Sequence, residues 1–216
     1  MRLNIFSNLV AKYPQETNLD DIVRIMRNSE KLHSLCHQRV KLIANGKKEE
    51  AELIKKKQIP AFAPCAYMID GKSRNHVIGL TDLCFLEIDH ITEEQIQTAK
   101  GILSKDEHVM LALRSISGDG LHFLIRYGFY DMEQPSYGNT RRGRMNYIYG
   151  AVFKTLKTTY QEALGVRIDS SGANMERLCL ISADKDLYYN PNALPVIFLY
   201  EKEKIRKSPM ILTIRN

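Results

Sequence analysis

The pattern of apolar and polar residues predicts a helical N-terminal part followed by alternating strands and helices. After a short N-terminal strand, apolar residues recur at helical spacing across residues 18–57. Asn18 is suited to cap the first helix of this part. Residues 59–72 contain two prolines, so we predict an irregular segment or an edge strand there.

Beyond residue 76 the periodicity switches repeatedly between that of strands and that of helices. The predicted elements are strands 77–89, 108–115, 121–128, 166–169, 176–182 and 196–200, and helices 92–105 and 139–165. Their order, β-α-β-β-α-β, predicts an α+β fold built on a split βαβ sheet with helices packed on it. We therefore divide the chain into an N-terminal strand and helical extension (1–58), a principal domain (59–200) and a basic C-terminal tail (201–216).

The composition is that of a soluble globular protein, with 216 residues, 44% hydrophobic and 26% charged. No run approaches the roughly 18 to 20 apolar residues that span a bilayer, and the first residues lack the features of a secretory signal. We expect a cytoplasmic protein with no membrane partner. The net charge of +6 and the pI of about 9.1 suit a polyanionic partner.

Two basic clusters are candidates for such a contact. Arg141, Arg142 and Arg144 form one cluster, at the start of the predicted helix 139–165. The lysines within 47–57 form the other, but interleaved glutamates favour a solvated helix face there.

Sulfur and imidazole groups offer a weaker candidate site. His33, Cys36 and His37 share one face of a predicted helix, as zinc ligands would. Because no fourth ligand accompanies them, an ordinary helix face is favoured.

Glu87 and Asp89 stand at alternate positions in an apolar stretch, CFLEIDHI. In a strand, alternation places both carboxylates on one face, at the rim where the chain turns into the next helix. Two neighbouring carboxylates repel unless a cation lies between them or one is protonated. A hard ion, Mg²⁺ or Mn²⁺, is the natural occupant. The alternatives are two exposed acids, or an ion pair with a nearby arginine.

A Gly-rich turn, SISGDGLH, joins two predicted strands. Gly118 allows a close backbone approach to a phosphate, and Ser115 and Ser117 offer hydroxyl donors. His122, at the start of the second strand, can face the acids, or can equally be a hydrogen-bonded structural residue.

The third candidate stretch begins at Asp169, at the end of a predicted strand. Asp169 can complete a carboxylate cluster with Glu87 and Asp89. Arg177 can clamp a triphosphate with its planar guanidinium, or can form an ion pair with one of the acids.

This order of motifs resembles that of the archaeo-eukaryotic primase superfamily, the primase-polymerases. The similarity is closer to the primase-like domain of bacterial mobile-element proteins that is labelled VirE N-terminal, over roughly residues 58–200. The segments that carry it are SISGDGLH and IDSSGANMERLCLISADKDLYYNP. The first acid, Glu87, departs from the aspartate usual in the superfamily, which puts polymerising activity in doubt more than metal or nucleotide binding.

The resemblance implies a palm-like (RRM-like) sheet that binds divalent metal and nucleotide. By position, Glu87, Asp89 and Asp169 would be the catalytic and metal-binding acids. The nucleotide-binding residues would be Ser115, Ser117, Gly118, His122 and Arg177, and the cluster Arg141, Arg142 and Arg144 would contact nucleic acid.

Two functions from different classes follow from this resemblance. The first is a nucleotidyltransferase domain of mobile-element DNA replication, acting on nucleoside triphosphates and on single-stranded DNA or a DNA/RNA primer-template. The second is a nucleic-acid-binding module that no longer polymerises and positions a helicase or another replication partner. A metal-dependent nuclease is disfavoured because no clustered histidine pair or suitably placed tyrosine accompanies the acids.

Overall fold

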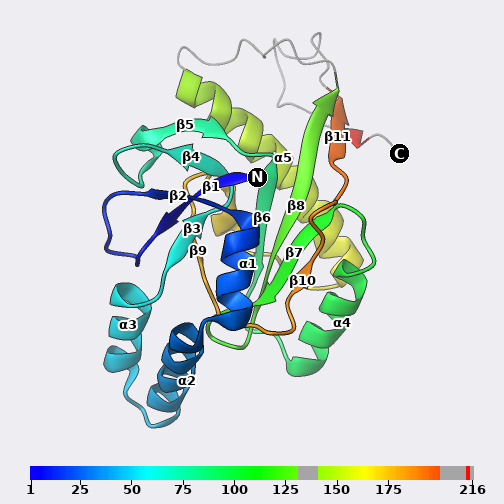
Figure 1. Ribbon diagram of the computed structural model, residues 1–216. Helices are drawn as coiled ribbons and strands as arrows, with labels where there is room; N and C mark the ends of the chain where they lie inside the picture. Colours follow the sequence, from blue (N-terminus) through cyan, green and yellow to red (C-terminus); the bar gives the residue numbers. More distant parts are fainter. Residues whose placement is uncertain (131–140, 200–212, 215–216) are drawn as a thin grey trace.

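The computed structural model describes residues 1–130, 141–199 and 213–214, and it has a mixed α+β fold (Figure 1). The helices are α1 (Leu19–Asn28), α2 (Glu30–Ala44), α3 (Lys48–Lys57), α4 (Glu93–Leu103) and α5 (Arg141–Leu164), with 3-10 helices η1 (Arg74–His76) and η2 (Ser170–Ala173). The N-terminal strands are β1 (Arg2–Phe6), β2 (Gln15–Asn18), β3 (Ala61–Ala63), β4 (Ala66–Met68) and β5 (Val77–Leu80). The remaining strands are β6 (Leu83–Ile88), β7 (Val109–Arg114), β8 (Leu121–Tyr130), β9 (Cys179–Leu180), β10 (Tyr188–Tyr189), β11 (Val196–Leu199) and β12 (Thr213–Ile214).

The largest sheet is centred on β8, which runs antiparallel to β6 on one side and to β7 on the other. β6 and β7 are therefore parallel to each other, and α4 connects them. β10 extends the sheet beyond β7, while the far end of β8 pairs in parallel with β11. Figure 1 shows α5 lying across one face of this sheet. Because β6 ends where β8 begins, the residues that follow β6 lie beside the β7–β8 turn.

Local signals set α1 and α4 as expected. The Asn18 side chain accepts a hydrogen bond from the backbone N–H of Asp21, which caps α1. Thr92 and Gln95 form a reciprocal capping box at the start of α4. These interactions satisfy helix N–H groups that have no partner within the helix.

A second, smaller sheet has the strand order β2-β1-β3-β9. Its strand β3 lies between β1 and β9, so the prediction of an irregular or edge segment at 59–72 is wrong for residues 61–63. Pro60 and Pro64 flank β3 instead of interrupting it, so neither removes a hydrogen bond from the ladder.

Two further predictions differ from the structure. The predicted strand 77–89 is two strands, β5 and β6, which Thr81 and Asp82 separate. The Thr81 hydroxyl donates to the Pro64 carbonyl and accepts from the backbone N–H of Leu83, which fixes the break. Residues 166–169 form no strand, because Asp169 caps the 3-10 helix η2 with its side chain.

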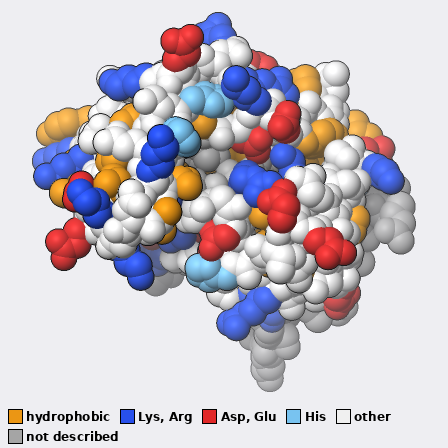
Figure 2. Space-filling view, turned by 90° about the horizontal axis from the view of Figure 1, so that it is seen from below, with side chains coloured by type: hydrophobic (Ala, Val, Ile, Leu, Met, Phe, Trp, Pro, Cys, Tyr) orange, Lys and Arg blue, Asp and Glu red, His pale blue; other side chains and the backbone are white. Residues whose placement is uncertain are grey.

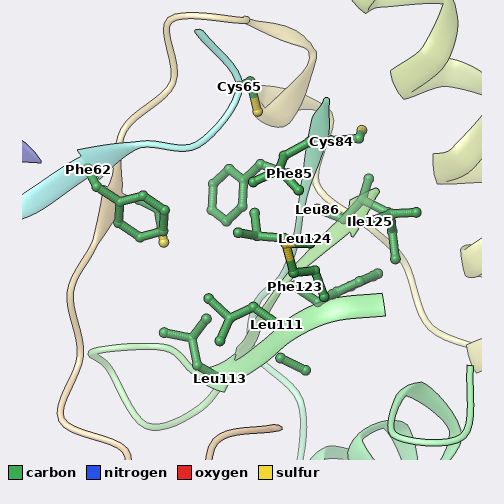
Figure 3. Packing of buried hydrophobic residues seen from close by; sticks show 14 of the residues in the cluster. Phe62, Cys65, Cys84, Phe85, Leu86, Leu111, Leu113, Phe123, Leu124 and Ile125 are labelled. Carbon is green, nitrogen blue, oxygen red and sulfur yellow. The ribbon is translucent and has the colours of Figure 1, made fainter. Parts of the chain in front are cut away.

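The core lies between the two sheets and under α5. Figure 3 shows Phe62 of β3 and Phe85 of β6 directed towards the same space, with side chains of β7 and β8 beside them. Both phenylalanines are fully buried, and each such burial contributes about 1.5–3 kcal/mol. This packing fixes the end of β6 relative to β9, the strand that follows Arg177.

Two further observations concern the surface. None of the helices in the described part of the chain has both the length and the apolar character needed to cross a bilayer. The lysines within 47–57 follow the pattern of a solvated helix face, with Lys47 paired to Glu50 and Lys55 to Glu52. The predicted tail 201–216 lies outside the described residues, apart from the backbone of β12.

Candidate functional site

Glu87 is the centre of the candidate site. It is the penultimate residue of β6 and only 4% of it is exposed. Its Oε2 accepts hydrogen bonds from Arg177 Nε and from the Ser171 hydroxyl, both at 3.0 Å. Its Oε1 accepts from Arg177 Nη2 at 3.3 Å. Of the alternatives considered for these acids, the ion pair with an arginine is the one that Glu87 adopts.

His122 lies directly opposite Glu87, because the two residues are partners in the β6–β8 register. Its ring packs edge-on against Phe85, with the centroids 5.4 Å apart. Nδ1 lies 3.6 Å from the Cys179 sulfur, and Nε2 lies 3.6 Å from Glu87 Oε1. Each ring nitrogen of His122 therefore faces a different buried side chain.

The protonation of His122 is decided by its burial. Desolvation lowers the pKa of His122 to about 4, with the charge of Arg177 acting in the same direction and that of Asp89 opposing it. The 3.6 Å contact with Glu87 satisfies a distance criterion for an ion pair. Since the imidazole is neutral near pH 7, its contact with the Glu87 carboxylate is not an ion pair.

Asp169 is brought to the same place by its backbone and its side chain. Its N–H donates to the Glu87 carbonyl at 2.8 Å. Its carboxylate accepts from the backbone N–H of Ser171 at 3.0 Å and from the Ser171 hydroxyl at 2.8 Å. These hydrogen bonds, the backbone one first, lower the pKa of Asp169 despite an opposing effect of burial.

The Ser171 hydroxyl thus contacts the carboxylates of both Glu87 and Asp169. A hydroxyl carries a single proton, so it can donate to only one of them at a time. The sequence reasoning missed Ser171, although the Asp-Ser-Ser spacing is typical of a turn in which an aspartate accepts from the backbone two residues on. Cys179 of β9, which is buried, was not assigned to the site either.

Asp89 lies just beyond β6 and is exposed. Its position is tied to the β7–β8 turn through Gly120, where an added Cβ would lie 3.1 Å from Asp89 Oδ1 and 2.5 Å from the Ile88 carbonyl oxygen. Only glycine fits so close to that carbonyl. His90, the next residue, has a left-handed backbone (φ 57°), and its Nδ1 is 3.0 Å from Asp119 Oδ2.

The turn is held by hydrogen bonds within its own backbone and by Arg114 of β7, whose Nη1 donates to the Gly118 carbonyl at 2.9 Å. The Ser115 N–H donates to the Gly120 carbonyl at 2.9 Å, and the Gly118 N–H donates to the Ser115 carbonyl at 3.0 Å. Gly118 has a φ of +86°, which explains the glycine, but its N–H is already used within the turn. Ser117 is exposed, while the Ser115 hydroxyl is buried and has no hydrogen-bond partner among the described residues.

The predicted nucleic-acid contacts lie at the start of α5. The side chain of Arg141 lies outside the described residues, and Arg144 is partly buried. Arg142 is exposed and lines a hollow of about 610 Å³ together with Arg74, which sequence reasoning missed. Arg74 donates to Glu176 and Asn174, in the loop that leads to Arg177. The hollow therefore adjoins the segment that supplies the site's arginine.

A metal ion would have few ligands here from the protein alone. In residues 1–130 and 141–199, no group of three or more His, Cys, Asp or Glu side chains is arranged to hold a metal. Glu87 already engages Arg177, so Asp89 and Asp169 are the acids left for a cation. On α2, His33 Nε2 lies 3.1 Å from the Met26 carbonyl oxygen. The metal role predicted for Glu87, Asp89 and Asp169 stays a prediction.

Figure 2 views the end of the molecule at which β6 ends and β8 begins. Acidic and basic side chains are intermingled over this end, with histidines between them. The surface here is not uniformly positive, so any polyanion must be recognised by particular side chains.

Comparison with known families identifies the class of this chain. The family model described as BT4734-like, N-terminal domain matches residues 54–189, and the chain belongs to this family. The match includes every residue from Glu87 to Arg177 and leaves out α1 and α2. No curated protein and no solved structure matches the chain.

Proposed function

We propose that this protein is a primase-polymerase-like nucleotidyltransferase domain that serves DNA replication of mobile elements. In this proposal it binds a nucleoside triphosphate with Mg²⁺ or Mn²⁺, and single-stranded DNA or a DNA/RNA primer-template. The strands β6, β7 and β8, together with the connecting helix α4, would be a palm-like, RRM-like split βαβ unit. The fold supplies the frame, and the function is argued from the side chains at its site.

The observation that carries the proposal is the meeting of three distant segments at one end of β6. Glu87 faces His122 across the β6–β8 ladder, and it is bonded to Arg177 and, through its carbonyl, to Asp169. Gly120 holds the turn against Asp89. Apart from Gly120, these are residues that the resemblance assigns to the metal and nucleotide site, and their sequence separation makes the meeting a property of the fold.

Charge supports a substrate that carries its own cation. The site holds the carboxylates Glu87, Asp89 and Asp169 against one guanidinium, with His122 neutral. A free triphosphate would be repelled by this excess of negative charge. Magnesium commonly binds through one or two carboxylates together with substrate phosphates. The protein would therefore recognise the metal–nucleotide complex, with Asp89 and Asp169 facing the ion.

The other side chains would orient the phosphates. The Arg177 side chain is 40% exposed, and its Nε and Nη2 donate to Glu87. Among the described residues, Nη1 has no hydrogen-bond acceptor, so it can donate to a phosphate. A guanidinium held in this way is oriented before the substrate arrives, which lowers the entropy lost on binding. The exposed Ser117 hydroxyl would add a donor, and Arg74 and Arg142 would contact the nucleic-acid backbone.

Calorimetric titration with ATP and dATP, each with and without Mg²⁺ or Mn²⁺, tests the proposal. We expect binding that depends on the metal and is weakened at least about tenfold in Asp89→Asn, a neutral and nearly isosteric change. Glu162→Gln, on the exposed surface of α5, is the matched control and should bind as the wild type does. Absence of nucleotide binding by the wild type under all these conditions would refute the proposal.

A second function is favoured by the ion pair itself. Glu87 is committed to Arg177, so a module that binds nucleic acid without polymerising, and positions a helicase or another replication partner, is also consistent with the site. Primer extension on a single-stranded template separates the two. Product that is lost in Asp89→Asn supports the enzyme, whereas intact DNA binding without product leaves the binding module.

A further inference from the structure

The β7–β8 turn is held from outside the family-matched region by a buried arginine. Arg39 of α2 is 4% exposed, and its Nη1 donates to the Ile116 carbonyl at 3.1 Å. Nη2 lies 3.7 Å from Glu52 Oε1 of α3, a longer contact with a partly exposed carboxylate. Residue 116 belongs to the turn that carries Ser115, Ser117 and Gly118.

The desolvation cost of burying Arg39 exceeds the stability that its contacts in the folded protein contribute. Removing a guanidinium from water carries a large desolvation cost, and a single carbonyl with one distant acid offsets it only partly. The Arg39 Nε has no hydrogen-bond partner in the described part of the protein. An apolar side chain of similar size would fill the same space without that cost.

A second unpaired atom lies on the same turn. Buried side-chain polar atoms without a partner number two among the described residues, Arg39 Nε and the Ser115 hydroxyl oxygen. Ser115 is the residue immediately before Ile116, whose carbonyl Arg39 holds. Buried polar groups are rarely left unpaired, and those that are call for an explanation. Here one unpaired atom belongs to the turn itself, and the other belongs to the arginine that donates a hydrogen bond to the turn.

We propose that Arg39 is a positioning residue of the nucleotide site, so that the N-terminal helical extension forms part of that site. This inference rests on the proposed function and adds to it how the site is held together. By fixing the Ile116 carbonyl, Arg39 sets the conformation in which the turn presents the exposed Ser117 to the phosphates of a metal–nucleoside triphosphate. It also places a permanent positive charge behind the turn, where low dielectric strengthens its attraction for phosphate.

The position of Arg39 in the chain makes the inference specific. The family match begins at residue 54, whereas Arg39 and its partner Glu52 precede it. The proposal therefore assigns part of the site to α2 and α3, which pack against each other.

The test compares Arg39→Met, which keeps the length and removes the charge, with Arg39→Lys, which keeps a charged donor. We expect Arg39→Met to weaken binding of Mg²⁺–ATP about tenfold in calorimetry, and Arg39→Lys to restore most of the affinity. Arg24→Met, an exposed arginine on α1, is the matched control and should leave affinity unchanged.

A second readout separates positioning from general stability. In nucleotide-free protein, the amide resonances of Gly118 and Gly120 should shift in Arg39→Met, while the thermal midpoint stays near that of the wild type. Arg39→Met that folds, keeps these resonances and binds nucleotide as the wild type does would overturn the inference.

If Arg39→Met does not fold, Glu52→Gln is the alternative variant, because it removes the charge of the partly exposed carboxylate next to Arg39. It should shift the Gly118 resonance and weaken binding severalfold, and unchanged resonances with unchanged affinity would refute the role of Arg39. A wild-type protein that binds no nucleotide refutes the proposed function instead, and the resonance comparison still reports whether Arg39 sets the turn.

Discussion

The guanidinium of Arg177 holds the buried carboxylate of Glu87 through two hydrogen bonds, from Nε at 3.0 Å and from Nη2 at 3.3 Å. The two residues are 90 positions apart in the chain. The Glu87 side chain is 6% exposed and that of Arg177 is 40% exposed, so the pair has one buried and one accessible member. Glu87 is therefore held inside the fold, whereas Arg177 remains accessible to a ligand.

Removal of Arg177 should destabilise the fold. Arg177→Ala leaves Glu87 buried without its counter-charge, which we expect to cost about 3 kcal/mol in the free energy of unfolding, at the lower end for a buried pair because Arg177 is partly exposed. Urea unfolding monitored by circular dichroism measures this cost. Arg74→Ala, which breaks an exposed ion pair with Glu176, is the control and should cost less than about 1 kcal/mol.

The double variant Glu87→Gln with Arg177→Ala checks the cause of that loss. Because it removes both charges, it should recover part of the stability. If Arg177→Ala costs no more than Arg74→Ala, the pair contributes little and Glu87 must be stabilised in another way.

Stability should fall in acid because of His122. Its pKa in the folded protein is about 4, below the ordinary value of 6.5. Between these values the unfolded state binds more protons than the native state, so stability is fully present above pH 6.5 and is lost as the pH falls towards 4. The loss from this residue is about 3 kcal/mol at most.

Urea midpoints measured between pH 7.5 and 4 test this dependence. His122→Gln should flatten the profile, whereas the control His37→Gln, at an exposed position on α2, should follow the wild type. An NMR titration that finds the His122 ring protonated at pH 6 would contradict the prediction.

Ser171 should couple Glu87 to Asp169. Ser171→Ala removes the hydroxyl that contacts both carboxylates, and we expect a loss of about 1 kcal/mol. The pKa of Asp169 should rise towards its ordinary value, since one of the hydrogen bonds that lowers it is gone. Carbon-detected NMR titration of the Asp169 carboxyl measures the shift. Ser104→Ala, at the exposed end of α4, serves as control.

The lowered pKa of Asp169 also determines how the stability of the protein changes with pH. Its contribution to stability is present above the ordinary aspartate pKa and is lost as the pH falls through the lowered value. In Ser171→Ala that contribution should shrink. An unchanged Asp169 titration in this variant would show that the backbone hydrogen bond alone holds the carboxylate.

Gly120 should tolerate no side chain. In Gly120→Ala the new Cβ would lie 2.5 Å from the Ile88 carbonyl oxygen, so the turn and the end of β6 must move apart. We expect a loss of about 2–3 kcal/mol. Gly150→Ala is the matched control: its Cβ meets nothing within 4 Å on helix α5, and it should stabilise the protein by about 0.5–1 kcal/mol. Thermal unfolding of both variants gives the comparison.

The elements closest to their predicted positions are those with local signals. The helix at 92–105 was predicted from its periodicity, and in the structure a reciprocal cap between Thr92 and Gln95 begins it. The strands at 108–115 and 121–128 were predicted from their strand-like sequence and the Gly-rich turn between them, and β7 and β8 confirm them. Such signals act between residues a few positions apart, so they can be recognised from the sequence alone.

The predictions that failed depended on distant partners. Residues 61–63 form an inner strand because β1 and β9 supply hydrogen bonds on both sides, which no pattern within 59–72 reveals. Residues 166–169 have strand-like composition, yet Asp169 bonds to the Glu87 carbonyl and caps η2.

The sequence by itself determined the candidate residues and the order of the central elements, because periodicity, capping and turn chemistry are properties of neighbouring residues. Only the tertiary structure decided which acid Arg177 binds, that Ser171 contacts two carboxylates, and that Arg39 holds the turn from α2. The residues next to an arginine in the sequence do not indicate which carboxylate or carbonyl its guanidinium will bind. That choice is made when packing brings segments tens of residues apart into hydrogen-bonding distance and excludes water from between them.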